Sequence, residues 1–372
     1  MARDPLHTKL CDMFGLEFPI VAFTHCKDVA VAVTNAGGLG ILGEGGRSPD
    51  EIAADVKWIR DRVGSRPFGV DLLIPASVPQ SGGRQDLAGQ IPEDYQHFVR
   101  RIKEDNSIPD PKDPDGRRLT GAIQTQDYAR KQLDVVLDER VPAFASALGN
   151  PAFMLEAAHA RGMKVFGLIG KVRQARREIE AGVDVIVAQG TDAGGHTGPI
   201  GTFTLVPQVA AIAGDTPIVA AGGVGTGRHL AAALCLGAVG VWTGTIWLTA
   251  RESDTDMVIK EKILAATEDD TTISRCMSGK PIRQLKTAWT EAWERPDAPT
   301  PLPMPLQGIL AGPVLQAVTD YKIEPFMGSP AGQVIGTITE LKPAREIVFD
   351  IVEEARDVLE SVLGEPAEAS VR

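Results

Sequence analysis

Residues 188–198, AQGTDAGGHTG, hold the densest set of groups in the chain that could do chemistry. They directly follow an apolar run that is typical of a buried strand. His196 is the candidate catalytic residue, because an imidazole with a reference pKa near neutrality can act as an acid or a base. The alternative is a ring that only hydrogen-bonds the loop backbone. Gly194 and Gly195 have no Cβ, so backbone N–H groups can approach a ligand there. The Gln189 amide can donate and accept, and could read the edge of a flavin or a pyrimidine.

Two more glycine clusters lie at the end of the seventh apolar run and within the eighth. They are AAGGVGTG at 220–227 and WTGT at 242–245. In barrels of alternating strands and helices, a phosphate often sits between the loops that follow strands seven and eight. Backbone N–H groups and helix dipoles can hold such a dianion even in an acidic protein. Each cluster alone would fit a tight turn, but the pair favours a ligand that carries phosphate.

The elements that must position these groups are eight short apolar runs. Most are continuous and not alternating, as expected for strands buried on both faces of a parallel sheet. Helical segments separate most of them, with Asp28, Ser48 and Thr226 as predicted N-caps and Gly182 as a predicted stop. The pattern predicts an α/β fold, a (β/α)8 barrel of the TIM type, with its active site at the carboxyl ends of the strands. The runs span 19–24, 39–42, 68–74, 141–148, 164–170, 184–190, 216–223 and 240–248, and the helices 28–36, 48–63, 171–181 and 226–236.

Residues 1–250 are predicted to form this barrel. Residues 75–130 interrupt it after the third strand and are rich in Pro, Asp and Gly, which indicates an inserted loop that could cover the site. Residues 251–372 are expected to form a C-terminal helical cap and tail. Within them we predict a helix at 253–267, a proline-rich linker at 296–305, an acidic amphipathic helix at 344–363 and a frayed tail at 364–372.

Composition excludes several classes of function. The 372 residues carry 38 basic and 49 acidic side chains, a net charge of −11, and only 5% are aromatic. Such a chain lacks the basic face of a nucleic-acid binder or an anionic-membrane binder. The six histidines show no ligand spacing, so no metal is expected. The cysteines at 11, 26, 235 and 276 form no CxxC pair and are interpreted as buried thiols.

Two patterns invite an interpretation that we reject. Residues 38–43 match GxGxxG, but they run through a predicted strand instead of following one, which argues against a dinucleotide site. Residues 230–250 carry no charge, yet a helical face that stops at Gly237 before a Val/Trp strand describes them better than a membrane span. The N-terminus has no apolar signal-peptide core. We therefore expect a cytoplasmic protein, with a homodimer as one possible assembly.

Several strings together resemble the nitronate monooxygenases, formerly called 2-nitropropane dioxygenases. The resemblance covers most of 12–250 and continues in MSGKPIR at 277–283 and AGQ at 331–333. It implies a barrel enzyme that uses FMN and O2 to oxidise alkyl nitronates, or nitroalkanes, to nitrite and a carbonyl product. His196 matches the catalytic histidine of the family. The strings are PIV at 19, AVTNAGGLG at 32, FGVD at 68, the loop 189–196, AAGG at 220 and residues 232–245. The FMN contacts implied by the resemblance are Asp71, Gln189, Gly194, Gly195, Gly222, Gly223, Gly244 and Thr245.

The chain departs from the family pattern near the expected flavin. Asp71 stands where an Asn is usual, and its carboxylate would repel phosphate or a reduced anionic flavin unless it is paired or protonated. The first strand ends in Phe23-Thr24-His25 where an Ala-Pro-Met turn is common. Phe23 and His25 are therefore candidate substrate contacts, with a purely structural His25 as the alternative. Asp192 replaces the more usual Glu.

The role of the residues leaves alternatives open. His196 could remove the α-proton of a nitroalkane or, as an imidazolium, stabilise the oxygens of a nitronate. Lys280 and Arg283 are interpreted as surface charges, with anion capture as the alternative. An FMN-dependent NAD(P)H reductase of a quinone or an enoyl thioester is the first alternative function. A non-catalytic flavin- or phosphate-binding module is the second, and a non-redox phosphosugar barrel would share the glycines but not explain the AGGH loop.

Overall fold

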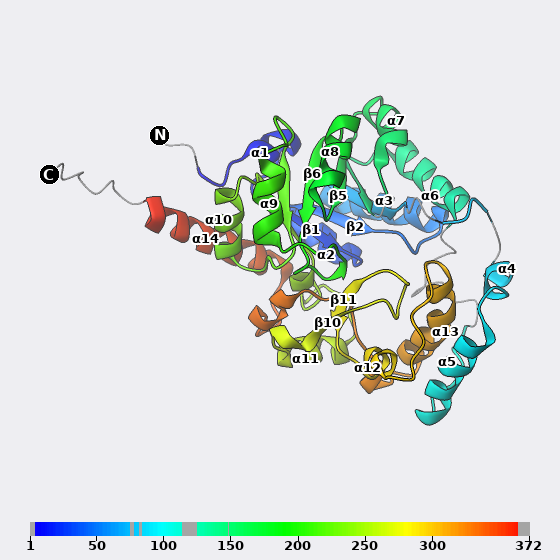
Figure 1. Cartoon of the computed structure of the whole chain (residues 1–372). Coiled ribbons are helices and arrows are strands. Elements are labelled where there is room, and N and C mark those ends of the chain that lie inside the picture. The colour runs from blue at the N-terminus through cyan, green and yellow to red at the C-terminus, as the bar shows by residue number, and fades with distance from the viewer. Residues whose placement is uncertain (1–3, 75–77, 82–83, 114–124, 148, 364–372) are drawn as a thin grey trace.

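The computed structural model describes residues 4–74, 78–81, 84–113, 125–147 and 149–363. Eight parallel strands close into a barrel in the order β1-β2-β3-β4-β5-β6-β8-β9 (Figure 1). This confirms the predicted TIM-type fold, and each predicted apolar run corresponds to one strand. The run at 240–248 is only half strand, because its second half is the short 3-10 helix η2, Thr245–Trp247. The strands are β1 (Ile20–Thr24), β2 (Leu39–Gly43), β3 (Phe68–Leu73), β4 (Ala143–Ala147), β5 (Lys164–Ile169), β6 (Val185–Gln189), β8 (Ile218–Ala221) and β9 (Gly240–Thr243).

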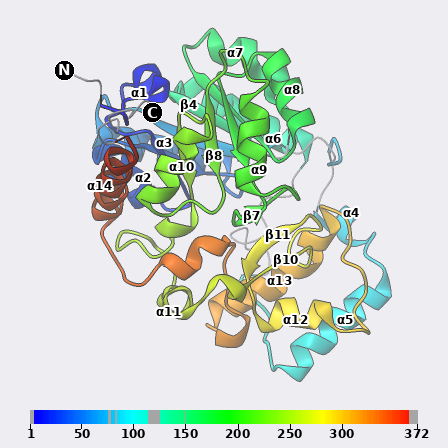
Figure 2. The ribbon, with the colours of Figure 1, turned by 60° about the vertical axis from the view of Figure 1, so that its left-hand side comes forward.

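Eight helices surround the barrel. The last of them, α14 (Ala344–Leu363), comes from the end of the chain and packs against α2 and α10 (Figure 2). Its apolar residues Val348, Ile351 and Ala355 share one core cluster with the barrel helices. The C-terminal helix therefore takes the eighth helix position of the barrel. The other seven are α2 (Lys27–Asn35), α3 (Pro49–Val63), α6 (Gln126–Glu139), α7 (Leu155–His159), α8 (Val172–Ala181), α9 (Thr202–Ala210) and α10 (Gly227–Cys235).

Local sequence signals explain some helix ends and not others. Ser48 caps α3 as predicted, since its hydroxyl accepts from the amide of Glu51 and the Glu51 carboxylate accepts from the amide of Ser48. The predicted Asp28 cap is wrong, because α2 begins one residue earlier, at Lys27. Thr226 occupies the N-cap position of α10, but its hydroxyl bonds the His229 ring and no amide.

Aromatic and aliphatic side chains fill the barrel interior at the amino-terminal end of the strands. Helix α1 (Lys9–Phe14) lies at the amino-terminal end of the strands, and Phe14 stacks on Phe166 of β5 with ring centroids 5.5 Å apart. The GxGxxG string lies within β2, as the sequence predicted. A Cβ on Gly40 would meet the carbonyl oxygen of Ala30 at 2.3 Å, so this glycine allows α2 to approach β2 closely. The string is therefore a packing feature.

Residues outside the barrel form a second layer with its own apolar core. A small antiparallel sheet, β10-β11-β7, joins β7 (Gly195–His196) to β10 (Thr271–Ser274) and β11 (Ile282–Leu285). Beside it lie α11 (Met257–Ala265), α12 (Ala288–Glu294), α13 (Leu306–Asp320) and two helices of the insertion, α4 (Arg84–Ala88) and α5 (Glu93–Asp105) (Figure 2). The remaining 3-10 turns are η1 (Pro151–Met154), η3 (Glu268–Asp270), η4 (Glu324–Phe326) and η5 (Gln333–Thr337).

The insertion after β3 differs from the loop that its composition indicates. Phe98, Val99 and Ile102 of α5 pack in one cluster with Trp289 and Trp293 of α12. An amphipathic helix therefore stands where the Pro- and Asp-rich flanks suggested only irregular chain. Residues 114–124 of the insertion and the predicted tail 364–372 lie outside the described residues.

The uncharged stretch 230–250 and the four cysteines can now be placed in the fold. Residues 230–250 divide into α10 and β9, and within the described ranges no helix is long and apolar enough to cross a membrane. All four cysteines are free; Cys11, Cys26 and Cys276 are buried as expected, whereas Cys235 is exposed.

Candidate active site

A cavity of about 890 Å³ opens at the carboxyl ends of the barrel strands. Its volume lies toward the upper end of the range for small-molecule and cofactor sites. Every residue that the sequence nominated for the site lines it. The region after residue 250 adds three parts of the wall, at 253–255, at 280–282 and at 329, 330 and 334, and of these residues the sequence analysis had singled out only Lys280. The nominated residues are Phe23, His25, Asp71, Gln189, Gly194, Gly195, His196, Gly222, Gly223, Gly244 and Thr245.

The floor of the cavity is aromatic. Phe23 at the end of β1 stacks on Trp242 of β9, with centroids 5.9 Å apart and ring planes 22° apart. His25 packs edge-on against Phe23 at 5.1 Å and donates from Nδ1 to the carbonyl oxygen of Gly43 at 2.9 Å. Because Nδ1 carries the proton, Nε2 of His25 is left as an acceptor. The altered first-strand turn thus presents an apolar face and one imidazole acceptor.

Asp71 lies in the carboxyl-terminal half of β3, between Gly43 of β2 and Ala145 of β4 in the sheet register. Its side chain is only 3% exposed, and Oδ2 has no hydrogen-bond partner in the described part of the chain. Burial raises the pKa of this carboxyl well above its usual range. This shift favours the neutral form of the carboxyl, which weakens the charge repulsion expected from an ionised Asp71.

His196 is held by three contacts that span distant parts of the chain. It lies on β7, opposite Ile282 of β11. Its Nε2 is 2.9 Å from Oγ of Ser278, and its carbonyl oxygen accepts from the Gln189 amide at 2.8 Å. Burial, together with the positive charge of Lys280, lowers the pKa of His196 to about 4. The ring is therefore neutral at pH 7, which argues against the imidazolium alternative.

Lys280 and Arg283 were interpreted as surface charges, and both interpretations are wrong. Lys280 lines the cavity, and burial lowers the pKa of its ammonium group. Arg283 is buried; its Nε donates to the carbonyl oxygen of Thr191 at 2.9 Å and Nη1 donates to Oγ1 of Thr271 at 3.1 Å. Lys280 thus supplies the cavity with positive charge, whereas Arg283 ties β11 to the loop that carries His196. No local signal marked this difference, because it depends on how the C-terminal segment docks.

The glycine loops form a cradle of unpaired amides. Gly222 and Gly223 both have left-handed backbone conformations, with φ of +96° and +72°. In the described part of the chain, the amides of Gly223, Val224 and Thr245 donate to no protein acceptor. A Cβ on Gly244 would meet nothing closer than 3.9 Å. These two loops can therefore offer N–H donors to an anion.

The two glycines before His196 have different roles. A Cβ on Gly194 would lie 2.7 Å from the carbonyl carbon of Ala331, so this glycine admits the C-terminal segment, and its backbone also lines the cavity. That segment is fixed further by the amide of Gly332, which donates to Oγ1 of Thr245 at 2.9 Å. Gly195 has φ +81° and open space where a Cβ would stand, so a ligand can approach its backbone.

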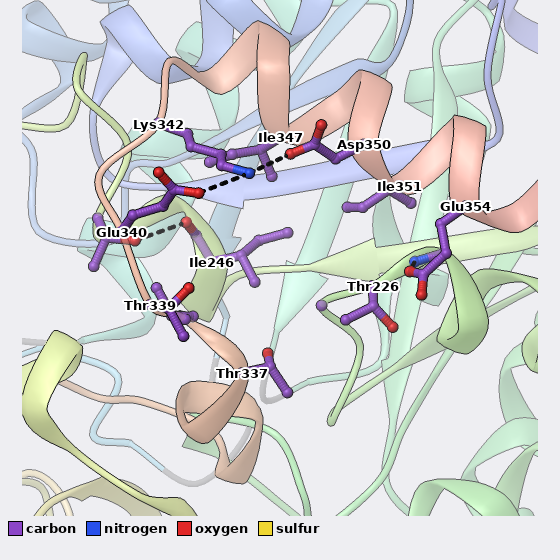
Figure 3. Close-up of a pocket in the computed structure, with 14 residues that line it drawn as sticks. Thr226, Ile246, Thr337, Thr339, Glu340, Lys342, Ile347, Asp350, Ile351 and Glu354 are labelled. Carbon is purple, nitrogen blue, oxygen red and sulfur yellow. Dashed lines mark hydrogen bonds and ion pairs between the residues drawn. The ribbon is translucent and has the colours of Figure 1, made fainter.

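A smaller pocket of about 200 Å³ lies behind the 223–227 loop, between α10 and α14 (Figure 3). Lys342 on its rim pairs with Glu340 at 3.1 Å and with Asp350 at 2.8 Å. Glu354 accepts from the amide of Gly227 at 2.7 Å and pairs with Arg228. This carboxylate caps the N-terminus of α10, so an anion in the large cavity must rely on the loop amides and not on that helix end.

Across the ranges that the structure covers, no group of His, Cys, Asp and Glu side chains is placed to hold a metal ion. The cavity thus combines an apolar floor, a neutral imidazole, an ammonium group, a buried carboxyl group and a cradle of amides.

Comparisons with known proteins agree on one family. The model of the nitronate monooxygenase family matches residues 7–354. A Mycobacterium tuberculosis protein named "Putative monooxygenase Rv1533" is 42% identical over 96% of this chain and 99% of its own. A Staphylococcus aureus "Probable nitronate monooxygenase" is 25% identical over 95% and 98%.

Solved structures show the same likeness. The nitroalkane oxidase from Streptomyces ansochromogenes superimposes with a TM-score of 0.79 at 28% identity, covering 95% of this chain and 99% of that one. FabK from Thermotoga maritima gives 0.74 at 28% identity, covering 95% and 98%. The chain belongs to the nitronate monooxygenase family of flavin-dependent oxidoreductases.

Proposed function

We propose that the protein binds FMN in the large cavity and oxidises alkyl nitronates with O2, giving nitrite and a carbonyl product. The single observation that carries the proposal is that His196, Lys280 and the unpaired amides of both glycine loops line one cavity. Family membership and the likeness to a nitroalkane oxidase support it.

The residues present fit this cofactor. The amides of Gly223, Val224 and Thr245 would hold the phosphate, since no protein acceptor uses them within the described ranges. The orphaned carboxyl of Asp71 and the Gln189 side chain offer polar groups for the edge of the isoalloxazine ring. FMN, when bound, supplies the electron transfer, and the protein supplies orientation and electrostatics.

Two residues would act on the substrate. A nitronate is an anion that has already lost its α-proton, so it needs a positive charge more than it needs a base. Lys280 provides that charge from the cavity wall. A neutral nitroalkane must first lose its α-proton, and His196 is uncharged at neutral pH and so able to accept it.

A second candidate function is an FMN-dependent NAD(P)H reductase of a quinone or an enoyl thioester. The likeness to FabK favours this function, and so does the size of the cavity, which leaves room beside a cofactor for a larger substrate.

One set of spectra separates these functions. The purified protein should be yellow, and FMN should be the flavin released on denaturation. Anaerobic addition of a nitronate should bleach the flavin, and aerobic turnover should yield nitrite. Rapid bleaching by NAD(P)H without any nitronate activity would instead select the reductase. A yellow protein that reacts with neither would be a non-catalytic binding module, and a colourless protein without FMN affinity would overturn all flavin functions.

A further inference from the structure

Asp71 is a buried acid that the proposed function places at the edge of the flavin ring without assigning its protonation state. It lines the large cavity from the carboxyl-terminal half of β3, with Gly43 and Ala145 as its sheet neighbours. The side chain is 3% exposed, and Oδ2 has no partner within the described ranges. An unpartnered buried polar atom costs folding free energy unless a ligand satisfies it. Its position therefore points to a ligand atom in the cavity.

The surroundings do not compensate a negative charge at this position. From β2, Glu44 follows Gly43; its amide donates to the Asp71 carbonyl oxygen, and its own acidic side chain is buried. From β1, His25 uses Nδ1 on Gly43. From β4, Ser146 bonds the carbonyl oxygen of Gly149. None of these groups donates to the Asp71 carboxyl.

Neither His196 nor Lys280 changes this balance. His196 and Lys280 line the same cavity from β7 and from the segment before β11, but neither forms an ion pair or a hydrogen bond with Asp71 in the described chain. A buried carboxyl without a cation or a donor favours its neutral form. A neutral carboxyl has an O–H donor as well as a carbonyl acceptor, the same pair of functions as an amide.

We propose that Asp71 is a neutral carboxylic acid that donates a hydrogen bond from its O–H to the bound flavin, so that it serves as an acid in place of an amide. The inference rests on the proposed flavin binding. It also resolves how an acidic residue can stand beside a cofactor and an anionic substrate. In its neutral form Asp71 repels neither.

Two variants of matched shape test the inference. Asp71→Asn keeps a donor and an acceptor, whereas Asp71→Leu keeps the branched shape and removes both. The first measurement is the infrared difference spectrum between wild type and D71N at pH 7.5. It should show the C=O stretch of a protonated carboxyl group in the wild-type protein. The second is the FMN dissociation constant, followed by flavin fluorescence on dilution of the yellow protein.

D71N should bind FMN within about threefold of wild type. D71L should bind it about tenfold or more weakly, the size expected when a buried acceptor on the ligand loses its donor. Circular dichroism of both variants controls for folding. If D71L does not fold, the infrared spectrum and the FMN affinity of D71N still test the inference, because an amide that replaces a neutral acid should leave the FMN affinity nearly unchanged.

Three results would overturn the inference. They are carboxylate bands in place of the protonated band, an affinity of D71L equal to that of wild type, or a D71N affinity reduced as strongly as expected for D71L. These outcomes differ from failure of the proposed function, because a wild-type protein that binds no flavin would still report the protonation state of Asp71 in its infrared spectrum.

Discussion

The protonation state of His196 gives the sharpest prediction about activity. Its pKa is lowered from 6.5 to about 4 by burial and by Lys280. This lowering corresponds to about 3 kcal/mol against protonating the ring. At pH 7, roughly one molecule in a thousand then carries an imidazolium. The neutral ring should therefore be the working form across the neutral range.

His196→Asn removes the base but keeps a polar side chain near Ser278. Turnover of a neutral nitroalkane should fall by about two to four orders of magnitude. Turnover of a preformed nitronate should fall by less than about tenfold, because no proton has to be removed from it. FMN should stay bound, which the visible spectrum checks. The rate of nitrite release by H196N and by wild type, measured with each of the two substrates, gives both losses of turnover.

The pH profile tests the electrostatic part of the reasoning. For wild type, kcat/KM with a nitroalkane should stay level toward acid and fall only near the low pKa of His196. Lys280→Met removes the neighbouring positive charge, so the acid limb should move to higher pH, toward but not reaching 6.5, since burial remains. The ionisation of the substrate is measured separately. An acid limb near 6.5 in wild type, an unmoved limb in K280M, or full activity of H196N on nitroalkanes would refute the argument.

Two further predictions concern stability and a third concerns retention of the cofactor. Glu354→Ala should lower the free energy of unfolding by about 1–2 kcal/mol, because the amide of Gly227 loses its cap; thermal unfolding against Glu354→Gln measures it. Burial raises the pKa of Glu178 from 4.5 to about 8. Between these two pH values the folded state keeps a proton that the unfolded state has already released, so the free energy of unfolding falls as the pH rises from 4.5 to 8. Glu178→Gln should reduce this slope by about 1.4 kcal/mol per pH unit in unfolding measured at several pH values. Gly194→Ala should displace Ala331 and weaken FMN retention, measured by gel filtration.

Each stability prediction has a matched control. Glu44, whose pKa is also raised to about 8, leaves part of the pH slope in place in E178Q. An unchanged slope in that variant would mean that Glu178 is not protonated in the folded state. Gly195→Ala meets open space and should cost only about 1 kcal/mol for its left-handed backbone. If G194A and G195A lost FMN to the same extent, the packing role of Gly194 would be contradicted. An E354A protein as stable as E354Q would contradict the capping role of Glu354.

The barrel and the location of the site were predictable from the sequence, because both follow from local patterns. Continuous apolar runs that end in glycine specify buried parallel strands, and Ser48 and Gly182 mark helix ends by chemistry within a few residues. Parallel strands in a closed barrel bring all their carboxyl ends to one rim. Residues that follow different strands, such as Asp71 and His196, must then share that rim wherever they lie in the chain.

Only the tertiary structure decided the features that depend on contacts between distant segments. The sequence could not show that α14 completes the ring of barrel helices, or that α5 packs on α12. It could not place Ser278 against His196, 82 positions away, or bring Lys280 into the cavity. Burial and Lys280 set the charge state of the imidazole, because the pKa of a side chain depends on what surrounds it in space and not on its neighbours in the chain.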